Sequence, residues 1–167
     1  MKYAIVVDSK SGNTRMLANI IQEHLENNDC VYIGDIPIDE IQADILFVGF
    51  WTDKGSCSDG MKDYLSSLQH QHIFLFGTCG FGKEQSYYER ILSNVATYVH
   101  DRTTVLGGFM CQGKMNIAVR ERYVSMLDEN PNMRDMIENF DQALSHPNEE
   151  DFTALCETID HTIKAYL

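Results

Sequence analysis

Long apolar runs and positive charge are both scarce in this sequence. No window approaches the roughly 20 apolar residues that a membrane-spanning helix needs, and Met1 and Lys2 lead directly into a short apolar segment without the layout of a secretory signal. Lysine and arginine total 13 against 25 aspartate and glutamate residues, so the formal charge is −12. We therefore expect a cytoplasmic protein whose partners are neither nucleic acid nor a membrane.

Cysteine pairs are missing as well. The five cysteines are odd in number and widely spaced, with no CxxC pair, and the six histidines have no metal-ligand spacing. We expect free thiols and no metal site. Cys57, Cys79 and Cys111 each follow the expected end of a strand, so a redox role for these thiols stays open beside the commoner interpretation as buried, inert residues.

The length and the distribution of charge bound the organisation of the chain. With 167 residues, 44% of them hydrophobic, the sequence predicts a single domain over residues 1–167, made of a core (1–115) and a C-terminal helical segment (116–167). Residues 128–160 hold ten acidic side chains and one basic side chain, Arg134. This acidic segment is either a solvated face or a surface that steers a basic protein partner. We expect a monomer or a weak dimer.

Apolar patterning predicts an alternation of strands and helices. The expected strands are 2–8, 30–33, 44–50, 73–77 and 103–109, and the expected helices among them are 17–25, 59–68 and 85–99. Residues 34–43 are too few for a crossover helix and predict one turn at most. This order indicates an α/β fold with a doubly wound parallel sheet. Further helices are expected at 117–127, 133–144 and 149–166, the last capped by Asn148.

The strongest functional signal is the segment Ser9-Lys10-Ser11-Gly12-Asn13-Thr14, between the first strand and the first helix. A helix N-terminus presents unpaired N–H groups and a partial positive charge, so it binds a phosphate without arginine. The hydroxyls of Ser9, Ser11 and Thr14 add donors, Gly12 permits a close turn and Asn13 tolerates left-handed geometry. The GxxxxGK(S/T) and GxGxxG loops are both absent, which favours a monophosphate bound without metal.

These residues resemble the phosphate loop of the flavodoxin family, S/T-x-S/T-G-x-T. The resemblance covers about the first 115 residues and is strongest to small stand-alone flavodoxin-like proteins, which share the loops that begin at Gly49 and Gly77 and the segment Cys111–Lys114. It implies a three-layer flavodoxin-like fold with five strands in the order 2-1-3-4-5 and extra C-terminal helices. It also implies that flavin mononucleotide (FMN) lies across the carboxyl ends of the strands.

Two further loops are expected to surround the flavin. The first contains the only tryptophan and consists of Phe50, Trp51, Thr52, Asp53, Lys54 and Gly55; an aromatic ring there suits stacking on the isoalloxazine. The second consists of Thr78, Cys79, Gly80, Phe81 and Gly82, whose small residues let backbone N–H groups approach the ring. In flavodoxins a tyrosine from this region usually covers the outer face, and here Phe81, Tyr87 or Tyr88 must substitute.

The loop after Trp51 departs from many flavodoxins, which have glycine there. Thr52 and Asp53 follow the aromatic residue, and glycine returns only at Gly55. Rotation of the Thr52–Asp53 peptide would place a residue with a Cβ at positive φ, which costs roughly 1–2 kcal/mol. The sequence therefore predicts behaviour closer to a two-electron carrier, unless the Lys54–Gly55 peptide rotates instead.

The functional prediction is an FMN-binding electron-transfer protein that passes electrons to a redox partner, either a flavin or an iron–sulfur oxidoreductase. No catalytic residue is assigned. The first alternative is an NAD(P)H-dependent FMN or quinone reductase, in which Lys114, Arg120 and Arg122 meet a phosphorylated substrate. A remote alternative is a receiver-type signalling domain, because Asp8, Asp53, Thr78 and Lys114 sit at the ends of four strands. Asp8 lacks the adjacent acid that such domains need for magnesium.

Overall fold

A computed structural model describes residues 1–82 and 84–167 and contains one parallel sheet. Its strands are β1 (Lys2–Val7), β2 (Asp29–Gly34), β3 (Ile45–Trp51), β4 (His72–Cys79) and β5 (Thr104–Gln112). They are ordered β2-β1-β3-β4-β5, and every neighbouring pair is parallel. The α/β class and the strand order expected from the sequence are thereby confirmed.

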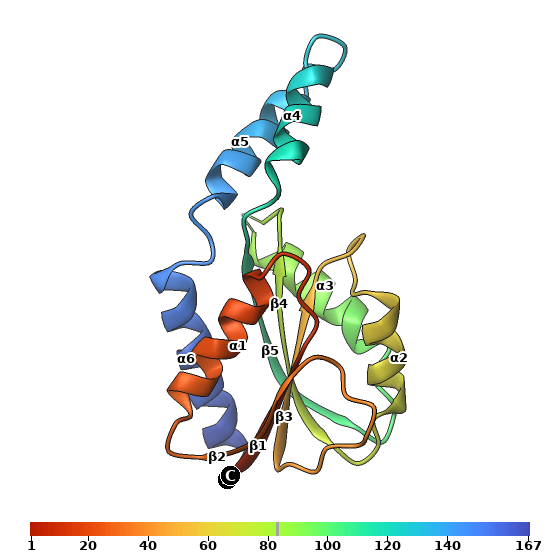
Figure 1. Cartoon of the computed structure of the whole chain (residues 1–167), viewed down its shortest axis with the longest axis vertical. Coiled ribbons are helices and arrows are strands. Elements are labelled where there is room, and N and C mark those ends of the chain that lie inside the picture. Colours follow the sequence, from red (N-terminus) through yellow and green to blue (C-terminus); the bar gives the residue numbers. More distant parts are fainter. Residues whose placement is uncertain (83) are drawn as a thin grey trace.

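Helices cover both faces of the sheet. They are α1 (Asn13–His24), α2 (Asp59–Ser67), α3 (Gln85–Ala96), α4 (Ile117–Met126), α5 (Met133–Ala143) and α6 (Glu149–Tyr166). Figure 1 shows α1 and α6 on one face and α2 and α3 on the other, which gives three layers. Along residues 1–82 and 84–167, none of the helices combines the length and the hydropathy of a membrane span.

The sheet has a hydrophobic core on each face because alternate strand residues point to opposite sides. Val6 belongs to the core under α2 and α3, while its neighbour Ile5 belongs to the core under α1 and α6. Both side chains are fully buried, as are those of most central strand residues. This double burial explains why the strands appear in the sequence as apolar runs without alternation.

The C-terminal segment divides into two parts with different roles. Helix α6 lies beside α1, and Leu155 and Ile159 are buried in the core of that face. Asn148 caps α6 as expected, in a reciprocal arrangement with Asp151. Helices α4 and α5 instead form a hairpin that projects from the carboxyl edge of the sheet (Figure 1). The expected boundary at residue 115 therefore separates the hairpin from the sheet, but α6 belongs to the layered fold.

Smaller differences concern the ends of elements. Helix α1 begins at Asn13, four residues before its apolar pattern starts at Leu17, because the phosphate loop itself makes the first turn. Strand β5 continues to Gln112, beyond the expected end at Phe109, since it pairs with β4 as far as Cys79. Residues 34–43 contain no helix, in agreement with the sequence prediction.

Candidate functional site

A cleft of about 670 Å³ opens at the carboxyl edge of the sheet. Four segments line it: the loop after β1, the end of β3, the end of β4, and the connection from β5 into the first turn of α4. The lining residues are Lys10, Ser11, Asn13, Trp51, Thr52, Thr78, Cys79, Gly80, Gly113, Lys114, Met115, Asn116 and Val119. The chain leaves β1 for one face of the sheet and β3 for the other, so the cleft lies at the topological switch point where α/β proteins bind ligands.

The loop from Ser9 to Thr14 places the N-terminus of α1 beside this cleft. Gly12 precedes the helix with φ +93° and provides no side-chain cap. The Ser9 hydroxyl oxygen accepts hydrogen bonds from the N–H groups of Gly12 and Arg15, each at 3.2 Å, and so holds the loop closed. The first turn of α1 contains no acidic side chain, so its partial positive charge is not neutralised there.

Thr14 has a contact that the sequence did not reveal. Its side chain is buried, its hydroxyl donates to the carbonyl oxygen of Phe50 at 3.3 Å, and it lies 2.9 Å from the hydroxyl oxygen of Thr78. The expectation that this hydroxyl faces a phosphate does not describe the structure, in which it ties the loop to β3 and β4. The sequence shows that a threonine stands at position 14, but the direction of its hydroxyl depends on how α1 packs against β3 and β4.

Asn13 joins the phosphate loop to the opposite side of the cleft. Its amide nitrogen donates to the carbonyl oxygen of Lys114 at 2.9 Å, which fixes the orientation of the amide. The amide oxygen is buried and has no hydrogen-bond partner among the described residues. Such an acceptor costs about 1–3 kcal/mol when unpaired. The ribityl chain of FMN carries hydroxyl donors, so this oxygen suits that ligand.

Trp51 forms the wall of the cleft at the end of β3. Its ring is partly exposed, and the ammonium nitrogen of Lys10 lies 4.8 Å from the ring centroid in a cation–π contact. This pairing leaves an aromatic surface and a positive charge together in the cleft. The aromatic ring suits stacking on a flavin ring, and the ammonium group suits a phosphate.

The turn after Trp51 is closed by its own hydrogen bonds. The N–H of Asp53 donates to the carbonyl of Ser56 and the N–H of Ser56 donates to the carbonyl of Asp53, both at 2.9 Å. Lys54 and Gly55 occupy the two positions between them with φ of 49° and 77°, as in a type I′ turn. Thr52 lines the cleft, but Asp53, Lys54 and Gly55 do not.

The expected second flavin loop, residues 78–82, contributes three residues to the cleft, two at the end of β4 and one directly after it. Thr78, Cys79 and Gly80 line the cleft, whereas Phe81 and Gly82 lie outside its lining. Neither Tyr87 nor Tyr88 reaches the cleft, and the Tyr88 hydroxyl donates to the carbonyl of Gly82 at 3.2 Å. None of the three aromatic residues expected to cover the flavin therefore lines the cleft.

The surroundings of the cysteines near the cleft favour the protonated thiol over the thiolate. Burial raises the pKa of Cys79 to about 12, and burial also raises the pKa values of Cys57 and Cys111. The Cys79 thiol donates to the carbonyl oxygen of Phe81 at 2.6 Å. Because a thiolate is the reactive form, these environments favour structural roles over redox chemistry.

The connection from β5 to α4 is the part of the site that the sequence prediction missed. Gly113, Met115, Asn116 and Val119 line the cleft, and among the residues of this stretch only Lys114 had been given a possible role, as a group for a reductase substrate. The carboxyl end of a fifth parallel strand lies at the same edge as the other four, so the residues that follow it could have been predicted to lie beside the cleft.

The receiver-type arrangement does not form. The Asp8 carboxylate accepts a hydrogen bond from Ser58, and the Thr78 hydroxyl is paired with Thr14. Within the part of the chain that the structure describes, no cluster of three or more acidic, histidine or cysteine side chains is arranged to hold a metal ion.

These features define a doubly wound α/β protein with a ligand cleft at its topological switch point and a helix N-terminus in that cleft. The sequence model of the flavodoxin domain matches residues 4–160, so the chain belongs to the flavodoxin family. The match extends well past residue 115, where the resemblance based on motifs ended, and it includes the hairpin and most of α6.

Two curated relatives have the name Flavodoxin-like domain-containing protein BilS. The protein from Clostridium symbiosum is 41% identical over 174 residues, covering 92% of each chain. That from Clostridioides difficile is 32% identical over 158 residues, covering 90% of each. The chain is thus similar to these proteins over nearly their whole length.

Solved structures agree on the fold. A flavodoxin from the domain Archaea and oxidised Flavodoxin 2 from Bacillus cereus each have a TM-score of 0.57 and full coverage of both chains, at 16% and 14% identity. A flavoprotein from Lactobacillus acidophilus in complex with FMN has a TM-score of 0.50 at 16% identity, covering 65% of this chain and 92% of that one. At these identities the likeness shows the fold alone.

Proposed function

We propose that the chain binds FMN non-covalently in the cleft and passes electrons between redox proteins. One observation carries this proposal: a single cleft is lined by residues at the N-terminus of α1, by Trp51 and by Asn13, whose buried amide oxygen has no partner among the described residues. Its volume lies within the range usual for small-molecule sites. The FMN complex of the Lactobacillus acidophilus relative in fold supports the choice of ligand.

Each part of the flavin has matching groups in the cleft. Ser11, Lys10 and the first turn of α1 would hold the phosphate, by hydroxyl, charge and helix dipole. The Asn13 amide oxygen would accept from a ribityl hydroxyl, and Trp51 would stack on the ring. The bound flavin supplies the ability to accept and release one or two electrons. The protein supplies binding, orientation and charge around it.

The partners we propose are flavin or iron–sulfur oxidoreductases. The acidic segment (residues 128–160) includes the hairpin tip, α5 and most of α6, and the end of α5 and the start of α6 lie near the edge where the cleft opens. Such a field steers a partner with a basic surface around its redox centre. Electron transfer to such a partner should slow as salt increases, because steering between exposed charges is screened.

A reductase that oxidises NAD(P)H itself is the second candidate. Lys10 and Lys114 both line the cleft and offer two positive charges to a phosphorylated cosubstrate. The Arg120 guanidinium does not take part, because it binds the Asp141 carboxylate through two hydrogen bonds of 2.7 and 3.1 Å. Arg122 is exposed on α4 and does not line the cleft.

Anaerobic reduction separates the two candidates. The purified protein is loaded with FMN, and its visible absorption is followed after addition of NADH or NADPH alone. A carrier keeps its absorption for minutes and bleaches only when a flavin reductase is added. Rapid bleaching by the nucleotide alone would identify the reductase. A protein that binds no FMN would exclude both candidates.

A further inference from the structure

The α4–α5 hairpin contributes little to the core of the sheet. Helix α4 has no buried residue, and Ile117 and Val124 on it are about half exposed. Figure 1 shows the hairpin standing clear of the layers that cover the sheet. Its two helices are joined by the paired Arg120 and Asp141, whose contact raises the pKa of the former and lowers that of the latter. Buried residues of the hairpin are confined to the end of α5, at Asn139, Phe140 and Ala143, so α4 is an ordered helix without an evident part in the core.

A buried hydrogen-bond network fixes the base of the hairpin to the cleft. The side-chain nitrogen of Gln112 donates to the carbonyl oxygen of Gly80 at 3.0 Å and to the amide oxygen of Asn139 at 3.1 Å. The amide nitrogen of Asn139 donates to the same Gly80 carbonyl at 3.0 Å. Gln112 and Asn139 are at most 8% exposed. Unpaired buried amides are costly, so the network holds α5 and the end of β4 in one arrangement.

This anchoring sets the position of Met115, which lines the cleft just before α4. Its thioether lies directly on Gly80, where an added Cβ would come within 2.7 Å of the Met115 Cγ. Val119, in the first turn of α4, also lines the cleft. Because β4 lies between β3 and β5, Trp51 and Met115 stand on opposite sides of the segment Thr78–Gly80.

We propose that Met115 forms the second wall of the flavin site, so that the flavin ring is held between the Trp51 indole and the Met115 thioether. The proposal rests on the proposed function. A thioether is polarisable and makes favourable contacts with aromatic rings, which suits this position. The hairpin then has a function in the site: it carries Met115 and Val119 to the face of the ring that Phe81, Tyr87 and Tyr88 do not reach.

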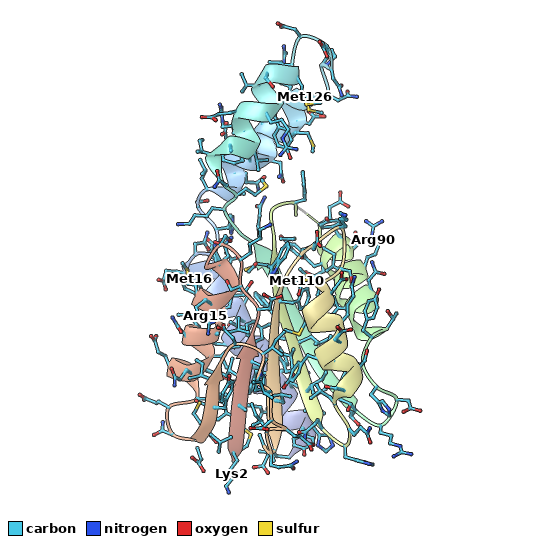
Figure 2. All side chains as sticks on the ribbon, turned by 45° about the vertical axis from the view of Figure 1, so that its right-hand side comes forward. Lys2, Arg15, Met16, Arg90, Met110 and Met126 are labelled. Atoms are coloured by element: carbon cyan, nitrogen blue, oxygen red, sulfur yellow. The ribbon has the colours of Figure 1, made fainter. Side chains whose placement is uncertain are left out.

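Flavin titration of matched variants tests the proposal. Met115→Ala should weaken both FMN and riboflavin by the same factor, roughly three- to tenfold, because the ring is common to both ligands. Met115→Leu should keep most of the affinity. Met126→Ala is the control, since Met126 is an exposed methionine at the last residue of α4, the helix that Met115 precedes, and lies far from Met110 and the sheet edge in Figure 2. It should change neither affinity.

A second measurement reports on the ring directly. The visible absorption band of the flavin should lose its fine structure in Met115→Ala, as the ring becomes more exposed to water, and stay unchanged in Met126→Ala. Equal behaviour of the two alanine variants would overturn the proposal, and so would a loss of FMN affinity without a matching loss for riboflavin. If the unmodified protein binds neither flavin, the proposed function fails as well. If it binds both but ignores Met115, only this proposal fails.

Discussion

Replacing Gly12 by alanine tests the phosphate loop at its most constrained position. Gly12 has φ +93°, and an added Cβ would meet nothing within 4 Å, so backbone strain is the main effect. Positive φ costs a residue with a Cβ about 1–2 kcal/mol. In a chain of this length such a loss lowers Tm by about 2–8 °C.

The same change should also separate FMN from riboflavin. If the introduced alanine relaxes toward negative φ, the N–H groups at the start of α1 turn away from the phosphate. The loss of one charge-assisted hydrogen bond of about 1.5–3 kcal/mol weakens FMN roughly ten- to hundredfold. Riboflavin has no phosphate and should bind as before.

Gly55→Ala is the matched control. Gly55 has φ +77° and equally open surroundings, but it lies in the turn after Trp51, whereas Gly12 is the N-cap residue of α1 between the cleft-lining residues Ser11 and Asn13. Thermal unfolding should show a similar loss for both variants, while fluorescence titration should show a loss of FMN affinity for Gly12→Ala alone. The reasoning is refuted if the two variants bind FMN equally, or if Gly12→Ala weakens riboflavin as much as FMN.

Three further predictions concern residues in and around the site. Thr14→Val removes the hydroxyl that contacts Phe50 and Thr78 and should lower the free energy of unfolding, measured by urea denaturation, by about 1–3 kcal/mol. Thr14→Ser keeps a hydroxyl and should retain most of that free energy. A valine variant as stable as the unmodified protein would contradict this prediction. Burial raises the pKa of Cys79 from 9.0 to about 12, so the thiol loses its proton at lower pH in the unfolded chain than in the folded one, and the free energy of unfolding should fall as pH rises above 9. Cys79→Ser should make this fall shallower. An unchanged slope would refute the assignment to Cys79. Rotation of the Thr52–Asp53 peptide would give Asp53 a positive φ, and Asp53→Gly would remove the resulting strain of about 1–2 kcal/mol. The first one-electron potential of the bound flavin should then rise by about 40–90 mV relative to the second. Unchanged potentials would show that this peptide does not rotate.

The layered fold was largely predictable from the sequence because its signals are local. Apolar runs in the sequence indicated all five strands, and the polar residues that follow the first run indicated the phosphate loop. The role of α6 was also within reach, since Leu155 and Ile159 repeat at the spacing of a buried helical face. We had placed α6 in an extra segment because the resemblance to flavodoxins, which rests on motifs, covers only about the first 115 residues.

The second wall of the cleft was not predictable in the same way. Met115 and Val119 look like ordinary hairpin residues in the sequence, and only the network of Gln112, Asn139 and Gly80 directs them to the cleft. That network joins residues up to 59 positions apart. Thr14 was misinterpreted for a related reason, because its hydroxyl direction follows from contacts with β3 and β4. Long-range contacts of this kind leave no local pattern.

Titration of the flavin-free protein with FMN and with riboflavin, followed by Trp51 fluorescence, tests the central claim most directly. The chain has one tryptophan, so the signal reports on the cleft alone. We predict quenching that saturates at one FMN per chain, with riboflavin bound at least tenfold more weakly because one or more phosphate hydrogen bonds are lost. Unchanged Trp51 fluorescence, or equal affinities for the two flavins, would contradict an FMN site built on the N-terminus of α1 and Trp51.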